Sequence, residues 1–319
     1  MVFLTAACQP VSRDVKPGGD ETSTAITIVG QQEYIVEQRL VLKNVGPGQP
    51  EKQNLWVALI RDLAPYQEVT SLTISPDRYT LVTDEYGNQF AEFDFSNHPA
   101  GSVKTVEIKT RVLVNELAYD LSDCSGELLD EFVGPELHIE SANPQIVRLS
   151  QSLTGQDATV CEKVRAFYDY VGDELTYTSN EQSWGAQAAL GPMGADCTEY
   201  SSLLIALSRA QGIPARYFEG LRYLESGSEA DTRVEHAWPD VYMPGVGWVA
   251  VDPTLGRSTL TREIYFAHYT PDHIIVTLGR NPSTLRGSSY WTHLYWPGNV
   301  TQISVESVEW KIELAGGQD

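Results

Sequence analysis

The stretch from Gly194 to Pro253 constrains this chain most, because it predicts one helix and the two strands that follow it. Asp196 is a favourable N-cap residue, and Glu199 three residues later completes a capping box, so Cys197 is predicted to be the first residue of the helix. Backbone N–H groups are free at a helix start and the helix dipole is positive there, so we expect the pKa of this thiol to be lowered. An apolar stripe at helical spacing then faces a core: Tyr200, Leu203, Leu204, Leu207 and Ala210.

A hairpin is predicted between His236 and Asp252, with proline and glycine residues at its turn. If Met243 pairs with Gly247 around a three-residue loop, the side chains of His236 and Asp252 lie on one face as diagonal neighbours. A loop of two or four residues would place the carboxylate on the opposite face unless a bulge intervened. In the first register Asp252 can hold one imidazole nitrogen while the other faces Cys197, as a general base requires.

Each of these residues, taken singly, has an ordinary interpretation. A lone buried Cys is usually a small hydrophobe, His236 alone would be a hydrogen-bonded core residue, and Asp252 alone would be a turn residue before Pro253. A Cys at a capped helix start, followed by a His and an Asp on successive strands, favours a reactive thiol instead. Trp238 is predicted to shield the His–Asp hydrogen bond from water, which is a packing role.

Four blocks of this stretch, in this order, resemble the catalytic core of the bacterial transglutaminase-like superfamily. The similarity covers about residues 155 to 257, and four ordered blocks are more specific than any one of them. The blocks are Gly194-Ala-Asp-Cys-Thr-Glu-Tyr200, Gly212-Ile-Pro-Ala-Arg216, His236-Ala-Trp-Pro-Asp-Val-Tyr242 and Gly247-Trp-Val-Ala-Val-Asp-Pro-Thr254.

The resemblance implies a papain-like α+β core with a catalytic triad of Cys197, His236 and Asp252, and no metal or cofactor is expected. The chain departs from the family at Pro239, where an apolar residue with a free N–H is more usual. Because proline removes a ladder donor, we expect this strand to lie at a sheet edge or to be bulged.

An oxyanion site needs two donors. The first is expected to be the backbone N–H of Cys197, which is free at the helix start. Tyr177, Trp184 and Gln187 each carry a suitable second donor, and the resemblance favours Tyr177 at its Leu-Thr-Tyr position. Each of the three residues taken alone is more often structural than catalytic.

Residues 25–120 alternate between apolar and polar positions in several short segments separated by turn residues, which predicts an antiparallel β-sandwich-like accessory domain. It also resembles, more weakly, the β-rich extension that precedes bacterial transglutaminase-like cores. It carries no cluster of Cys, His or acidic residues with the spacing of metal ligands. Residues 121–319 are assigned to the catalytic domain, in which Asp157 is expected to cap a helix that ends at Gly172. In the last strand, near residues 302–314, the side-chain parity changes between Val305 and Val308, so a bulge is expected.

Residues 1–24 are predicted to form a tether, with small residues before Cys8 that resemble the end of a lipoprotein signal. This suggests an extracytoplasmic protein, either attached to a membrane through a lipidated Cys8 or secreted. The alternative is a cytoplasmic protein in which Cys8 is an ordinary tail thiol. If the chain is exported, Cys124 and Cys161 can form a disulfide, although their sequence positions do not place them. The formal charge of −21 argues against a nucleic-acid partner.

These observations predict a cysteine-dependent acyl-transfer enzyme that acts on peptide or glutamine amide bonds through a thioester. Hydrolysis by a peptidase or amidase is slightly favoured because no calcium-binding loop is visible. The alternatives are a transglutaminase that cross-links glutamine to amines, and a cell-surface module that binds a peptide without turnover. His268, Asp272 and His273 are predicted to have ordinary surface or hydrogen-bonding roles. The oligomeric state is left open.

Overall fold

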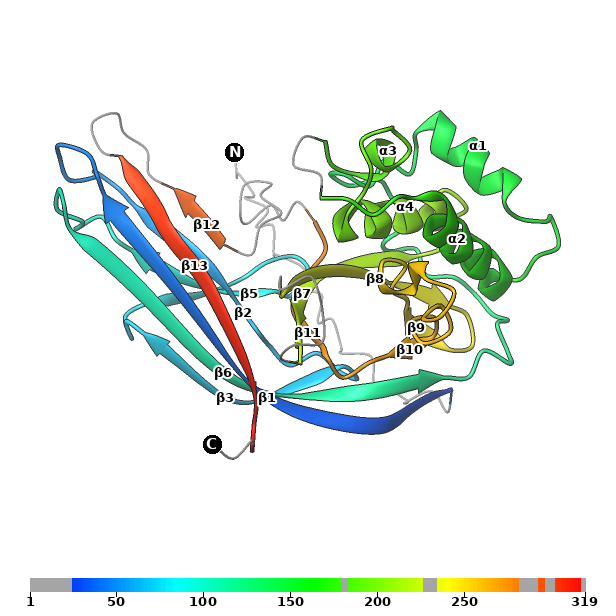
Figure 1. Ribbon diagram of the computed structural model, residues 1–319, viewed down its shortest axis with the longest axis horizontal. Coiled ribbons are helices and arrows are strands. Elements are labelled where there is room, and N and C mark those ends of the chain that lie inside the picture. Colours follow the sequence, from blue (N-terminus) through cyan, green and yellow to red (C-terminus); the bar gives the residue numbers. More distant parts are fainter. Residues whose placement is uncertain (1–24, 180–182, 226–233, 281–291, 296–301, 317–319) are drawn as a thin grey trace, which may run out of the picture.

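The computed structural model describes residues 25–179, 183–225, 234–280, 292–295 and 302–316, and Cys8 lies outside these ranges. The fold is α+β, as predicted, and consists of three antiparallel sheets and a layer of helices. In Figure 1 a two-sheet sandwich occupies one end of the molecule, and the helices cover the third sheet at the other end.

Two antiparallel sheets form the sandwich. Leu40, Leu55, Phe93 and Val106 from both sheets are fully buried between them, which is the alternating inward pattern of a β-sandwich. The larger sheet contains β10 (His268–Tyr269), β6 (Val103–Tyr119), β1 (Ile26–Asn44) and β13 (Ile303–Leu314), with β3 (Gln67–Ser75) also paired to β6. The smaller sheet contains β12 (Thr292–Tyr295), β2 (Asn54–Leu59), β5 (Gln89–Asp94) and β4 (Thr80–Thr83).

The last two strands return to the sandwich. β12 pairs with β2 and β13 pairs with β1, although the predicted division of the chain assigned residues 121–319 to the catalytic domain. The bulge predicted in the last strand is present, because Val41 pairs with Ser307 while Leu42 pairs with Val305. These two strands therefore lie in the sandwich, although they follow the catalytic blocks in the sequence.

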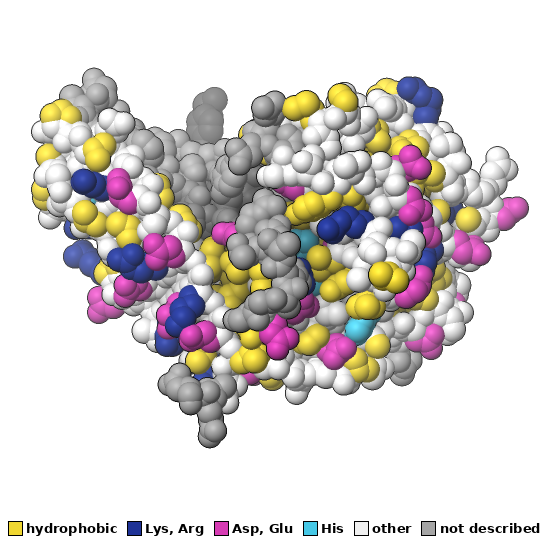
Figure 2. Space-filling view, viewed as in Figure 1, with side chains coloured by type: hydrophobic (Ala, Val, Ile, Leu, Met, Phe, Trp, Pro, Cys, Tyr) yellow, Lys and Arg dark blue, Asp and Glu magenta, His cyan; other side chains and the backbone are white. Residues whose placement is uncertain are grey.

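Charged side chains of opposite sign face one another across the strands of the larger sheet. Lys109 lies 2.7 Å from Glu37, and Arg111 lies 3.1 Å from Glu33. Figure 2 shows such side chains of both signs next to one another over this end of the molecule. Exposed pairs of this kind contribute little stability.

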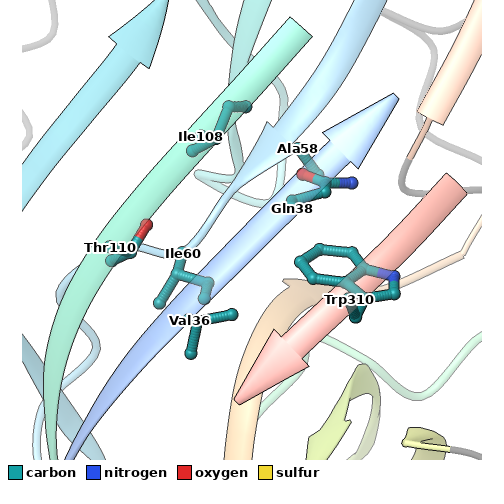
Figure 3. A pocket seen from close by; sticks show the side chains of 7 residues that line it. All are labelled: Val36, Gln38, Ala58, Ile60, Ile108, Thr110 and Trp310. Atoms are coloured by element: carbon teal, nitrogen blue, oxygen red, sulfur yellow. The ribbon is translucent and has the colours of Figure 1, made fainter. Parts of the chain in front are cut away.

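A small pocket lies between β1, β6, the end of β2 and Trp310 of β13 (Figure 3). It is lined by Val36, Gln38, Ala58, Ile60, Ile108, Thr110 and Trp310. None of these side chains is a Cys, His, Asp, Glu, Lys or Tyr, so the pocket lining holds no general base that could activate the Thr110 hydroxyl.

The third sheet, in the order β11-β7-β8-β9, carries the blocks singled out in the sequence. Its strands are β11 (His273–Leu278), β7 (Ala215–Arg222), β8 (Glu235–Met243) and β9 (Gly247–Ala250). One face packs against a helical layer made of α1 (Pro144–Ser152), α2 (Val160–Glu174), α3 (Ala186–Ala189) and α4 (Cys197–Arg209). A short 3-10 helix, η1 (Leu255–Arg257), follows β9 in the chain. The other face packs against the long strands β1 and β6, so this sheet lies between the helical layer and these two strands.

The start of α2 differs from the sequence-based interpretation, in which Asp157 caps the helix and Gly172 ends it. The N-cap is Thr159, whose hydroxyl accepts from the backbone N–H of Glu162, while the Glu162 carboxylate accepts from the N–H of Thr159. This reciprocal pair satisfies two free donors at once, which a lone Asp two residues earlier does not, and the helix continues to Glu174.

The expectation that Pro239 marks an edge or bulged strand is wrong. β8 lies between β7 and β9, and its register with β7 is regular, with Tyr217 opposite Pro239. The carbonyl of Pro239 accepts from the N–H of Val251, just after the last residue of β9. The missing proline N–H points to the same side as that carbonyl, where the β9 ladder ends, so an inner strand tolerates the proline there.

The sandwich covers the open edge of the third sheet. The side-chain amide of Gln67 donates to the carbonyl of Ile275 (2.9 Å) and accepts from its N–H (2.8 Å). Asn88 makes the same pair of bonds with Leu278 at 2.8 Å each. Because β11 is the edge strand, these two amides replace the missing neighbouring strand and satisfy its buried backbone groups.

A disulfide links Cys124 to Cys161, with Cα atoms 6.0 Å apart. The sequence alone leaves this pairing open. The bond fastens the connecting segment after β6 to the first turn of α2, across a sequence separation of 37 residues. The structure therefore restrains the connector between the sandwich and the helical layer.

Candidate active site

Cys197 is the first residue of α4, and Asp196 is its N-cap. The Asp196 carboxylate accepts from the N–H of Thr198 at 3.0 Å, and the Glu199 carboxylate accepts from the N–H of Asp196 at 3.2 Å. This is the capping box that the sequence predicts. Glu199 is fully buried and also accepts from the N–H of Gly185 at 3.3 Å, so it fixes the loop before α3 against the helix start.

His236 and Asp252 are hydrogen-bonded, with His236 Nε2 2.7 Å from Asp252 Oδ2. The hairpin has the predicted register, because Met243 pairs with Gly247 around a three-residue loop and both side chains lie on one face. The second oxygen of Asp252 accepts from the N–H groups of Thr254 and Leu255 at 2.9 and 3.0 Å. The carboxylate is therefore held on both oxygens before any substrate binds.

The Cys197 sulfur lies beside the start of β8. The N–H of Ala237, the residue after His236, hydrogen-bonds the thiol and acts to lower its pKa. The Ala237 carbonyl accepts from the Ser201 hydroxyl, one turn along α4, at 3.0 Å. The two elements that carry Cys197 and His236 are thus joined through a single residue of β8.

The expected lowering of the thiol pKa is wrong. Burial raises the pKa of Cys197 to about 12, and the negative charges of Asp196, Asp252 and Glu199 act in the same direction. These effects outweigh the Ala237 hydrogen bond. The pKa of His236 is lowered by burial, in spite of the opposing effect of Asp252. At rest the pair is accordingly a neutral thiol and a neutral imidazole, and a thiolate forms only when the proton is transferred.

His273, which the sequence analysis gave an ordinary role, contacts the same carboxylate. Its Nε2 lies 3.2 Å from Asp252 Oδ2, and its Nδ1 lies 3.0 Å from Asp272 Oδ1. Asp272 is in turn bound by the Arg222 guanidinium at 3.0 Å. The result is a chain of hydrogen bonds that runs from Arg222 through Asp272, His273 and Asp252 to His236.

Tertiary folding hides this contact from the sequence. His273 starts β11 and Asp252 follows β9, the two outer strands of the sheet, so their contact requires the sheet to curl. Figure 1 shows β7, β8, β9 and β11 arranged around a curve, with β10 beside β9. The only local signal was a second His-containing segment, Asp272-His273, at the start of a predicted strand.

Trp238 contacts both histidines. Its ring is stacked on His236 with centroids 5.6 Å apart and meets His273 edge-on at 4.8 Å. The indole crosses β7 at Gly220, where a Cβ would lie 2.5 Å from the Trp238 ring and 2.2 Å from the Ile274 carbonyl. With 1% of its surface exposed, Trp238 occupies the position expected for a side chain that keeps water from the His–Asp pair.

The three candidates for the second oxyanion donor are placed differently. Tyr177 forms a parallel β-bridge with Ala195, two residues before Cys197, and its ring contacts Tyr200 of α4. Trp184 is exposed and packs edge-on against His138, and Gln187 is exposed on α3. The structure therefore brings the segment of Tyr177 to the helix start.

His236, Asp252 and His273 are also the one group among the described residues with ligand atoms close enough to hold a metal ion, all within 4.8 Å. Two ligands of a tetrahedral zinc ion with bonds of about 2.0 Å lie roughly 3.3 Å apart. The 2.7 Å between His236 Nε2 and Asp252 Oδ2 is shorter and matches a charge-assisted hydrogen bond. The three side chains are arranged as a hydrogen-bonded chain.

Residues 147–253 match the sequence profile of the transglutaminase-like superfamily. The uncharacterized protein YebA of Bacillus subtilis is 30% identical over an alignment of 166 residues. The alignment covers 46% of this chain and 21% of that protein. The chain thus spans about a fifth of the length of this curated relative. A solved structure from Cytophaga hutchinsonii, described as a candidate cysteine protease, matches with a TM-score of 0.63 and 14% identity, covering 92% of this chain and 94% of that one. This last likeness shows a shared fold.

Proposed function

Because residues 147–253 belong to the transglutaminase-like superfamily, we propose that the chain is a cysteine-dependent acyl-transfer enzyme. Cys197 is its nucleophile, His236 its general base and acid, and Asp252 the residue that orients the imidazole. The observation that carries the proposal is the 2.7 Å bond from His236 to Asp252 beside a capped helix start that bears the thiol.

The reaction begins with a neutral pair. Asp252 accepts the N–H at His236 Nε2, so Nδ1 is the unprotonated nitrogen that takes the thiol proton. The sulfur attacks the carbonyl carbon of an amide as its proton moves to Nδ1, and the new oxyanion accepts hydrogen bonds from the Cys197 N–H and a second donor. The segment of Tyr177 is our candidate for that second donor.

The tetrahedral intermediate then collapses. His236 gives its proton to the leaving amine, the C–N bond breaks, and a thioester on Cys197 remains. An incoming water or amine loses a proton to the same nitrogen as it attacks the thioester. Loss of the thiolate, which recovers that proton, returns the neutral pair. The carboxylate of Asp252 stabilises the transient imidazolium without being protonated itself.

The substrate is proposed to be a protein or peptide, and hydrolysis is the favoured outcome. The alternative is transfer to an amine, which would make the chain a protein-glutamine cross-linking enzyme. Both share the thioester, so the acceptor decides. Incubating the protein with a glutamine-rich protein and a fluorescent primary amine separates them. Release of ammonia or of new amino termini without label supports hydrolysis, whereas label in the protein supports transfer.

Cys197→Ala is the control in that assay, because it removes the nucleophile and leaves the helix cap intact. Loss of both products in this variant is required by the proposal. If either product persists at the wild-type rate, another group is responsible. Absence of both products with the wild-type protein, together with unreactive Cys197, would favour a peptide-binding module without turnover.

We also propose that this enzyme works outside the cytoplasm. The Cys124–Cys161 disulfide supports this, since such bonds persist in oxidising compartments and are rare in the reducing cytosol. Among the residues described by the structure, no helix has both the length and the apolar character needed to cross a membrane. Attachment through a lipidated Cys8 remains part of the proposal, and labelling with a radioactive fatty acid in cells tests it.

A further inference from the structure

We propose that His273 is a positioning residue of this site. His273 binds Asp272 on one side and holds Asp252 in place for His236 on the other. Its positive charge sets the lower pH limit at which the site works. This inference rests on the proposed function and extends it to a residue outside the triad.

The contacts of His273 require a cation. Its two ring nitrogens face carboxylate oxygens, Asp252 Oδ2 at 3.2 Å and Asp272 Oδ1 at 3.0 Å. A neutral imidazole has one N–H donor, whereas a carboxylate only accepts, so both contacts are satisfied only when both nitrogens carry a proton. The hydroxyl of Thr270, 2.9 Å from Nδ1, can accept from the same N–H.

Burial and charge agree with this assignment. His273 is 2% exposed, and burial acts to lower its pKa. The carboxylates of Asp272 and Asp252 outweigh burial and raise the pKa to about 9. The pKa of Asp252 is lowered well below its usual range, because its pairing with His236 and His273 overcomes the opposing effect of burial.

Other ionisable side chains near His273, Asp252 and Asp272 also affect the charge of His273. The ring of His236 lies 5.6 Å away, and the rings of Tyr265 and Tyr269 lie 6.2 and 5.7 Å away. The titratable and charged groups that face His273 or its carboxylate partners are Asp252, Asp272, His236, Cys197, Tyr265, His268, Tyr269, Arg222, Tyr34 and Tyr168.

Two consequences follow for His236. The Oδ2 atom of Asp252 accepts from both imidazoles, so His273 fixes the side of the carboxylate that His236 uses. The charge on His273 also opposes a second charge on His236 and acts to lower its pKa. His236 therefore stays unprotonated, and able to accept the thiol proton, at a lower pH than it would beside Asp252 alone.

The test is the rate at which iodoacetamide alkylates Cys197 between pH 4 and 9, followed by mass spectrometry. Alkylation requires His236 to accept the thiol proton, which an imidazole that is already protonated cannot do, so the wild-type rate should fall at acid pH. In His273→Gln a neutral amide keeps the donor to Asp252 but removes the charge. A positive charge at this separation changes a pKa by about one unit, so this acid limb should move up by about one pH unit.

A second variant separates positioning from charge. His273→Leu removes the donor as well, so its limb should move and its rate above the limb should fall at least tenfold below that of His273→Gln. His268→Gln is the matched control, because His268 binds Glu116 at 2.9 Å and has no hydrogen bond to Asp252. Its profile should coincide with that of the wild type.

The outcomes are distinct. If both His273 variants lower the rate without moving the limb, the residue is merely structural and the inference is overturned. If the wild-type limb is unchanged in His236→Ala, His236 does not activate the thiol, and the proposed function fails together with the inference. Ring ¹⁵N NMR of the wild type needs no variant. It should find His273 doubly protonated at pH 7.5, and a neutral ring there would also overturn the inference.

Discussion

Removing the Cys124–Cys161 disulfide should destabilise the fold by an amount that its sequence separation sets. The bond closes a loop across 37 residues. In the chain-entropy treatment a loop of this length gives about 4 kcal/mol at 25 °C, because the reduced unfolded chain regains the freedom that the cross-link removed. For a chain of this size that corresponds to a fall in Tm of roughly 10 °C, at about 2–4 °C per kcal/mol.

The assay is urea unfolding followed by tryptophan fluorescence, in a Cys197→Ala background that prevents thiol exchange with the site. The oxidised protein is compared with the reduced protein and with the Cys124→Ser, Cys161→Ser double variant. The reduced and double-variant proteins should unfold at the same, lower urea concentration. Coincident midpoints for the oxidised and reduced proteins would refute the reasoning, because the cross-link would then not restrain the unfolded chain.

Two further changes test the surroundings of the site. Gly220→Ala should lower the free energy of unfolding by about 1–3 kcal/mol, because a Cβ there would meet Trp238 at 2.5 Å, whereas Gly155→Ala, with open space around it, should not; similar unfolding midpoints would contradict this. Asp272→Asn should cost about 1.5–3 kcal/mol at pH 7, since it removes a charged partner of His273. The folded pKa of Asp272 is lowered, because His273 and Arg222 overcome the opposing effect of burial, so this difference should shrink as the pH falls below about 4, and a constant difference measured down to pH 2 would argue against it.

The sequence predicts the parts of the site that depend on neighbours along the chain. The cap formed by Asp196 and Glu199 spans one helical turn, and the register that brings His236 to Asp252 depends only on a three-residue loop. Both are set by local geometry and hydrogen bonding. The four ordered blocks add the resemblance to the transglutaminase-like superfamily, whose sequence profile matches residues 147–253.

The parts that the sequence did not predict depend on tertiary packing. The pKa of Cys197 is raised because the helix start is buried among carboxylates, although a helix start in water would favour the thiolate. Pro239 is tolerated because β9 ends beside it. His273 reaches Asp252 only because the sheet curls, and no spacing along the chain reports that curvature.

Acylation of Cys197 with the help of His236 can be measured as a pre-steady-state burst with p-nitrophenyl acetate. We expect a burst of nitrophenolate equivalent to one acetyl group per protein, with the acetyl group on the peptide that contains Cys197 after an acid quench. In His236→Ala the burst should slow by about 10²–10⁴-fold. An acetyl group found on another residue, or a burst of equal rate in His236→Ala, would contradict the account.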